Sequence, residues 1–136
     1  MAEYQAGIVI SNALFRFPKA VDYRLFPWVT YTDPELAGVG LSEQQAREQG
    51  MDVEILRFPF RDIDRAVVEG TTLGETKFVV RKGKILGATI LGPHAGELLQ
   101  PWVLAIGQGV KIGAMANMIA PYPTLGEASK RAAGNY

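Results

Sequence analysis

The chain has 136 residues and 48% of them are apolar, so it can form one domain with its own hydrophobic core but not comfortably two. Its 14 basic residues balance 14 acidic ones, which argues against a nucleic-acid partner because phosphate binding needs clustered Lys and Arg in excess. There is no cysteine and one histidine, His94, which excludes a disulfide framework, a thiol nucleophile, an Fe–S cluster and a His-rich metal site within this chain.

The first apolar run, residues 6–17, predicts a helix. Apolar residues recur along one face at three- and four-residue spacing, namely Ile10, Ala13, Leu14 and Phe17. Pro18 would end this helix because its ring clashes with a continuing turn, and Glu3 stands where a secretory leader would carry positive charge. No run approaches the roughly 18 apolar residues of a membrane span, so we expect a cytoplasmic domain. Because no capping residue precedes the helix, we also expect a chain cut from a longer one.

The next part of the chain is rich in β-branched and aromatic residues. It predicts strands over residues 28–32, 36–41 and 53–58. Between the second and third strands, Ser42 opens a capping box that Gln45 completes, which predicts a helix ending near Gln49. Gly50 can then take the left-handed conformation that ends a helix. Residues 60–69 are charged, and their pattern leaves a loop or a helical turn open.

The clearest pair of strands covers residues 76–81 and 84–92. Only Lys82 and Gly83 separate these runs, and Gly83 supplies the positive φ that a tight hairpin needs. The sequence therefore predicts two antiparallel strands joined by a two-residue turn.

Helices are predicted for the last third of the chain. The first carries a wide apolar stripe formed by Leu98, Leu99, Trp102, Val103 and Ile106, and Pro101 either starts or kinks it. Residues 112–119 predict a second short helix. Residues 124–133 predict a third, with Thr124 as its N-cap and Glu127 completing a Thr-x-x-Glu capping box. Strands first and helices last are typical of an α+β fold, in which helices pack on one face of an antiparallel sheet.

Several polar or glycine-rich features have a structural explanation. Gly38 and Gly40 lack the third glycine of a dinucleotide fingerprint, and the helix after them opens with an acidic turn that repels phosphate. We therefore expect close backbone packing in a strand. His94 has no partner acid in sequence and is expected to be a surface or capping residue. A mixed-sign cluster predicts a solvated face with weak ion pairs, and it comprises Arg57, Arg61, Asp62, Asp64 and Arg65.

The segment Pro121-Tyr122-Pro123-Thr124-Leu125-Gly126-Glu127 differs from these. Two prolines fix the backbone around a tyrosine, just before a helix whose first turn carries a carboxylate. The plainest interpretation is a stiff turn followed by a capping box. The alternative is a phenol and a carboxylate held close together and displayed to a molecule outside this chain.

Five stretches of the sequence recur, in this order, in a known family. They are residues 27–41 (PWVTYTDPELAGVGL), 74–78 (GETKF), 85–88 (ILGA), Gly92 with Ala95 and Glu97-Leu98, and Pro123-Thr124 with Glu127. Through them the chain resembles the C-terminal dimerisation domain of the flavin-dependent pyridine nucleotide-disulfide oxidoreductases, which include dihydrolipoamide dehydrogenase, glutathione reductase and mercuric reductase. The resemblance implies a dimerisation domain over residues 21–136. It makes residues 1–20 the last helix of the preceding flavin-binding portion.

The resemblance also implies what complete relatives contain. FAD, the NAD(P) site and a redox cysteine pair lie in upstream domains that this chain lacks, and electrons pass from NAD(P)H through FAD and the disulfide to the substrate. The C-terminal domain holds the homodimer together and reaches into the partner's active site with a His-Pro-Thr-x-x-Glu motif. We therefore expect a homodimer joined to upstream FAD and NAD(P) domains, with Tyr122 and Glu127 as its site residues. We expect no cofactor or metal on this fragment itself, which alone would be inactive.

Tyr122 stands where that motif has its histidine. An unperturbed phenol has a pKa of about 10, against about 6.5 for imidazole, so Tyr122 is expected to be a poor proton acceptor at neutral pH. It could donate a hydrogen bond or, as a phenolate, bind a metal ion. Mercuric reductases resemble this chain in having tyrosine there, but they also carry a C-terminal cysteine pair that this chain lacks. The resemblance therefore leaves the substrate open between a disulfide and a metal ion.

We expect the dimer interface on the C-terminal helices, whose apolar residues exceed what one face of the sheet can cover. The predicted contacts are Leu98, Trp102, Ile106, Met115, Met118, Pro121 and Pro123. The alternative function is a stand-alone interaction or small-molecule-binding module without a redox role. An enzyme in its own right fails on residue inventory, because the chain has no thiol, metal cluster, phosphate loop or Ser-His-Asp set.

Overall fold

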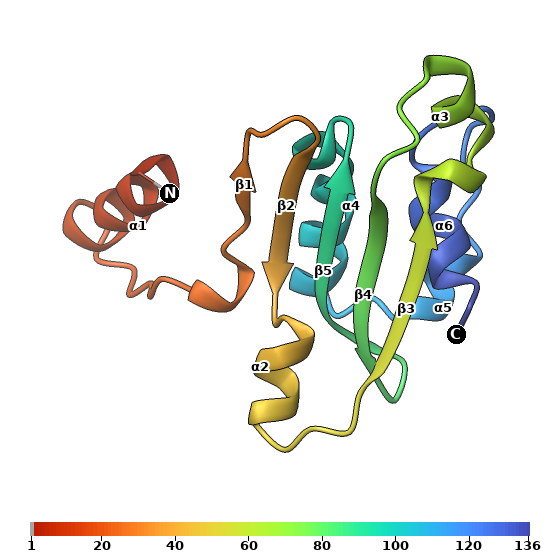
Figure 1. Ribbon diagram of the computed structural model, residues 1–136. Helices are drawn as coiled ribbons and strands as arrows, with labels where there is room; N and C mark the ends of the chain where they lie inside the picture. The colour runs from red at the N-terminus through yellow and green to blue at the C-terminus, as the bar shows by residue number, and fades with distance from the viewer. Residues whose placement is uncertain (1) are drawn as a thin grey trace.

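A five-stranded antiparallel sheet forms the centre of the computed structural model, which describes residues 2–136 apart from the side chain of Arg24. The strands lie in the order β1-β2-β5-β4-β3 (Figure 1). Their bounds are β1 Trp28–Thr30, β2 Glu35–Gly40, β3 Glu54–Pro59, β4 Glu75–Arg81 and β5 Lys84–Gly92. The predicted α+β fold is confirmed, and β1 ends two residues before its predicted boundary.

Three C-terminal helices cover one face of this sheet. They are α4 (Ala95–Gly107), α5 (Ile112–Ala116) and α6 (Glu127–Ala133). In Figure 1 they lie behind the strands, where α4 contacts β2 and β5, and α6 contacts β3 and β4. The α4 helix runs continuously through Pro101.

Four shorter elements surround this core arrangement. The helix α2 (Glu43–Glu48) follows β2, and the 3₁₀ turn η2 (Phe60–Asp62) and the helix α3 (Asp64–Glu69) follow β3. A second 3₁₀ turn, η1 (Tyr23–Leu25), leads into β1. The helix α1 (Ala2–Ala13) stands apart from the sheet, beyond its β1 edge (Figure 1).

The core is centred on a stack of two aromatic rings. Phe78 of β4 and Trp102 of α4 are both buried, with ring centroids 3.8 Å apart. The Trp102 indole Nε1 donates a hydrogen bond of 3.1 Å to the Ser129 hydroxyl of α6. A buried indole nitrogen needs such a polar partner. The hydrogen bond joins α4 to α6, and the ring stack joins α4 to β4.

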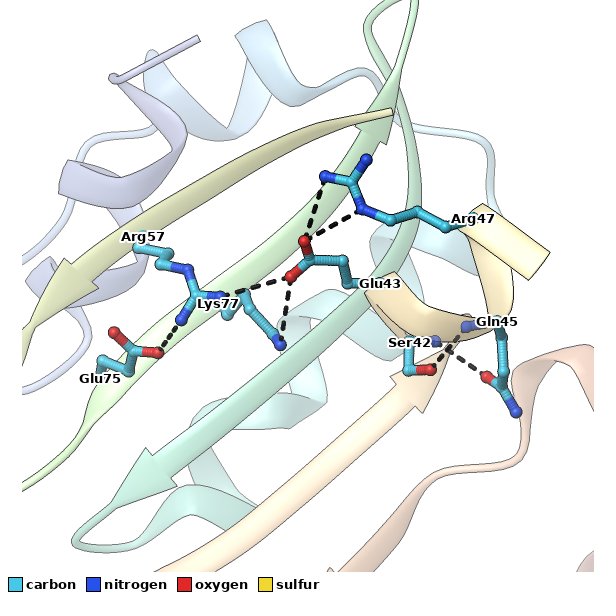
Figure 2. Close-up of polar contacts among 7 residues, drawn as sticks. All are labelled: Ser42, Glu43, Gln45, Arg47, Arg57, Glu75 and Lys77. Carbon is cyan, nitrogen blue, oxygen red and sulfur yellow. Dashed lines mark hydrogen bonds and ion pairs between the residues drawn. The ribbon is translucent and has the colours of Figure 1, made fainter. Parts of the chain in front are cut away.

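On the opposite face of the sheet, called the open face below, α2 covers one end. Ala46 of α2 packs there against Val79 and Val53 in a small second cluster. The predicted capping box holds the start of α2: the Gln45 backbone N–H donates to Ser42 Oγ at 3.1 Å, and the Ser42 N–H donates to Gln45 Oε1 at 2.9 Å. Figure 2 shows both halves of this box.

The β4–β5 hairpin confirms the predicted two-residue turn. Gly83 has a φ of 73°, and Lys82 also lies in the left-handed region with a φ of 49°. A turn with positive φ at both central residues matches the right-handed twist of the strands it joins. The sequence identified Gly83 alone, because lysine carries no signal for this conformation.

Two predicted helices end earlier than their apolar patterns indicate. The α1 helix stops at Ala13, and the Asn12 side chain holds the segment that follows by pairing with the Lys19 backbone, accepting from its N–H at 2.7 Å and donating to its carbonyl at 2.9 Å. The α5 helix stops at Ala116, where Asn117 Nδ2 donates to the Gly113 carbonyl at 2.9 Å. The Asn117 side chain thus competes with the backbone for a helical carbonyl.

The predicted N-cap of the last helix is wrong. The α6 helix begins at Glu127 rather than after Thr124, and no side chain caps it. Thr124 Oγ1 instead donates to the Pro121 carbonyl at 2.8 Å. The hydroxyl is therefore used to close the loop around Tyr122 rather than to start the helix.

Candidate functional site

The loop before α6 displays Tyr122 on the surface. The Tyr122 side chain has 68% of its area exposed, and the prolines on either side are exposed as well. The Thr124–Pro121 hydrogen bond closes this loop, and Leu125 packs against the core just beyond it. The loop is thus anchored at its C-terminal end while the phenol stays accessible. This geometry fits the alternative in which the phenol is displayed to another molecule.

The Tyr122 hydroxyl has a partner that the sequence did not indicate. It donates a hydrogen bond of 2.6 Å to Oδ2 of Asp64, the first residue of α3. This hydrogen bond and the negative charge of Asp64 raise the pKa of Tyr122 above that of a free phenol. The charge of Glu127 adds to the increase, and Arg131 opposes it.

A phenol with the ordinary pKa of about 10 is already neutral at physiological pH, and the raised pKa of Tyr122 leaves it so. That agrees with the expectation that Tyr122 is a poor proton acceptor at neutral pH. Because the folded-state pKa of the phenol is raised, the contact stabilises the fold below the ordinary phenol pKa of about 10 and is lost as the pH rises through the raised value.

Glu127, the second predicted site residue, is half-buried at the start of α6. It lines a surface cavity of about 500 Å³ together with Phe58, Lys130 and Arg131. Its charge influences the pKa of Tyr122, yet the phenol hydrogen bond goes to Asp64. The structure therefore pairs the phenol with a different carboxylate from the one that the sequence suggested.

The mixed-sign cluster divides between two parts of the surface. Arg57 lies on the open face of the sheet, where it meets Glu75 at 2.6 Å and Glu43 at 3.3 Å. Figure 2 shows the Glu43 carboxylate also contacting Arg47 at 3.1 Å and Lys77 at 3.8 Å. These contacts tie the start of α2 to β3 and β4.

The ion pairs of Glu43 give the α2 attachment a defined pH dependence. The hydrogen bond from Arg47 is the largest of the influences that hold the pKa of Glu43 below its ordinary value. Because the folded-state pKa is lowered, the stabilisation is present above the unfolded pKa and is lost as the pH falls through the folded value. The charged side chains on this face of the sheet therefore have a structural role, because their ion pairs hold α2 against the strands.

The remaining members of the cluster lie around α3. Arg61 meets Asp62 at 4.0 Å, and Arg65 pairs with Glu69 one helical turn away. These are exposed pairs of the kind that contribute little to stability, as expected. Asp64, between the two arginines, is the member that contacts Tyr122.

The predicted interface residues separate into two groups. Leu98, Ile106 and Met118 are half-buried, and Pro121 and Pro123 are exposed, so a second molecule could reach all five. Trp102 and Met115, in contrast, are buried within the chain's own core, which argues against a direct contact with a second molecule. Periodicity cannot tell which neighbour an apolar helical residue contacts. Leu104 and Ile119, which the sequence analysis did not select, are 65% and 95% exposed.

The glycine pair and the histidine have the structural roles that the sequence predicts. A side chain at Gly38 would meet the Trp28 indole, and one at Gly40 would meet the Leu86 carbonyl oxygen 2.3 Å away. Both glycines therefore serve close packing within the sheet. His94 is an exposed residue at the N-cap of α4, and its side chain caps no backbone N–H.

Two kinds of feature are absent from residues 2–136. No three side chains among the His, Asp and Glu of this range gather as metal ligands would. None of the helices in the same range combines the length and hydropathy of a membrane span.

Comparison with known families decides the relationship. The sequence model of the pyridine nucleotide-disulphide oxidoreductase dimerisation domain matches residues 26–133. The chain belongs to this family. The predicted resemblance is thereby confirmed, and the sheet with its three helices is the dimerisation domain.

The sequence relatives of this dimerisation domain are much longer proteins. A dihydrolipoyl dehydrogenase from Geobacillus stearothermophilus is 43% identical over 134 residues, which is 97% of this chain and 28% of that protein. A mercuric reductase from Staphylococcus aureus is 40% identical over 135 residues, which is 98% of this chain and 25% of that protein. The chain therefore spans about a quarter of the length of these curated relatives.

Solved structures give the same result. LpdA from Mycobacterium tuberculosis superposes with a TM-score of 0.91 at 25% identity, over 98% of this chain and 30% of that one. RclA from Escherichia coli, an HOCl-induced flavoprotein disulfide reductase, superposes with a TM-score of 0.87 at 27% identity, over 94% of this chain and 30% of that one. The dimerisation domain thus shares its fold with LpdA and with the flavoprotein disulfide reductase RclA.

Proposed function

We propose that this chain is the C-terminal domain of a flavin-dependent oxidoreductase that uses NAD(P)H. In that enzyme it forms the homodimer and places Tyr122 and Glu127 in the partner's active site. The supporting observation is that almost the whole chain aligns with a quarter of each relative named above. The acceptor is a disulfide or a metal ion, and a cytoplasmic location, compatible with the cysteine-free composition, is part of the same proposal.

The proposal assigns residues 1–20 to the last helix of the preceding flavin-binding portion and residues 21–136 to the dimerisation domain. Exposed apolar side chains on the first segment support this division. They are Val9, Ile10, Leu14, Phe15 and Phe17. Such a run of apolar side chains on a surface marks a contact with another protein segment.

FAD and NAD(P) would be held outside the described residues. The groove between η1, α2 and β5 has a volume of about 770 Å³ and is lined by side chains such as Phe26, Met51 and Gln49 rather than by a phosphate-binding loop. We therefore expect this groove not to hold a dinucleotide.

The dimer contact in this proposal uses the side chains that remain accessible on the C-terminal third. The proposed contact surface comprises Leu98, Leu104, Ile106, Met118, Ile119, Pro121 and Pro123. Four of these residues flank Tyr122 within residues 118–123. A dimer formed through them would bring the phenol close to the second subunit.

The protein encoded by the complete reading frame is expected to be a yellow dimer that oxidises NAD(P)H. Sedimentation velocity would give its mass, the visible spectrum its flavin content, and the loss of absorbance at 340 nm its activity. A disulfide and mercuric ion should be compared as acceptors. A colourless monomer without NAD(P)H oxidation would contradict the proposed function.

A further inference from the structure

The contact between Tyr122 and Asp64 joins segments that lie 58 residues apart in the sequence. Asp64 belongs to none of the five stretches through which the sequence resembles its family. A hydrogen bond at 2.6 Å between a hydroxyl and a carboxylate is short, as is typical when the acceptor is charged. The partner of the exposed phenol is therefore specific, although both side chains face solvent.

The segment that carries Asp64 is anchored by buried neighbours. Ile63, just before it, and Ala66, two residues after it, are both buried in the main core. The Ile63 N–H also donates to the Phe60 carbonyl at 3.0 Å, which joins η2 to α3. Because these neighbours hold the backbone of Asp64 in place, its exposed side chain loses little additional conformational freedom when it accepts a hydrogen bond.

The arginines on either side of Asp64 have other partners. Arg61 meets Asp62, and Arg65 pairs with Glu69. The charged groups that act on the phenol are then Asp64 from α3, and Glu127 and Arg131 from α6. The hydrogen bond to Asp64 is the largest influence among them.

We propose that Asp64 is a positioning residue for Tyr122. The Asp64 carboxylate accepts the hydrogen bond of the phenol O–H, so that the lone pairs of the phenol oxygen point outward. This inference rests on the proposed active-site role of Tyr122 and makes that role more specific. A phenol whose proton is directed to its own chain presents an acceptor to an incoming group. The substrate atom that it would contact is therefore electron-poor, such as a metal cation, rather than an anion.

The first test follows the phenol itself. The chain has five tyrosines, and labelling with ¹³C at Cζ gives one titrating NMR signal for each. We expect the signal that disappears in Tyr122→Phe to have a titration midpoint above the ordinary phenol pKa of about 10. Asp64→Asn should lower this midpoint towards that ordinary value, whereas Asp62→Asn, a neighbouring exposed carboxylate in contact with Arg61, should leave it unchanged. An unshifted midpoint in Asp64→Asn, or an equal shift in Asp62→Asn, would overturn the proposal.

The second test separates positioning from function in the intact protein. We expect Asp64→Asn to slow turnover several-fold in the wild-type background and to cause no further loss when Tyr122→Phe is already present, since Asp64 acts through the phenol. Equal losses in both backgrounds would contradict positioning and leave the proposed function intact. If Tyr122→Phe alone leaves turnover unchanged, the active-site role fails, while the NMR titration still decides the Asp64–Tyr122 contact.

Discussion

Replacing Trp102 with Ala is expected to lower the free energy of unfolding by about 3–5 kcal/mol, the range for truncating a large buried aromatic side chain. The indole is 1% exposed and stacks on Phe78. Its removal opens a cavity between the sheet and α4. It also deprives the Ser129 hydroxyl of its donor, which adds the cost of a buried polar group without a partner.

Trp28→Ala is the matched control, because Trp28 is 41% exposed on the open face of the sheet, where it lies over Gly38. We expect that variant to lose roughly 1–2 kcal/mol. Both values come from urea unfolding followed by far-UV circular dichroism at one low protein concentration, so that association contributes equally. Equal losses for the two tryptophans would contradict the assignment of Trp102 to the core and would return it to the list of interface candidates.

Tyr122→Phe in the intact protein is expected to lower turnover on the order of 100-fold, as does the loss of one positioned polar group from an active site. Phenylalanine keeps the ring between the two prolines and removes only the hydroxyl that contacts Asp64. The flavin content should stay unchanged, because the phenol lies in a loop of the dimerisation domain.

Steady-state assays and the flavin absorbance of the same preparation would check this prediction. Tyr31→Phe is the control, since Tyr31 is an even more exposed phenol in a different loop. Turnover that falls equally in both variants, or that stays at the wild-type level in Tyr122→Phe with both classes of acceptor, would argue against an active-site phenol.

Local sequence signals predicted those features of the fold that depend on neighbouring residues. The Ser42–Gln45 capping box and the Gly83 turn each lie within four residues, so their physical cause is visible in the sequence. The sheet and its covering helices followed from the order of strand and helix patterns. Helix ends were less predictable where a polar side chain such as Asn117 or Thr124 bonds to a nearby backbone carbonyl.

The candidate site was only partly predictable for the same reason. Pro-bracketed Tyr122 stood out locally, and its exposure fits the interpretation that it faces another molecule. Asp64 could not be found, because no pattern within its own segment distinguishes a carboxylate beside a distant phenol from one in a surface ion pair. The burial of Trp102 and Met115 was missed because a helical apolar stripe shows that a face is covered but not by what.

A photo-cross-linking residue at position 122 of the intact protein tests most directly whether this domain completes the site of a second subunit. Dimers would be assembled from ¹⁴N-labelled and ¹⁵N-labelled subunits and irradiated, and the cross-linked peptides would be identified by mass spectrometry. We predict products that join position 122 of one subunit to the flavin-binding portion of the differently labelled subunit. Cross-links confined to peptides of a single label would show that Tyr122 serves only its own chain and would contradict the proposed exchange between subunits.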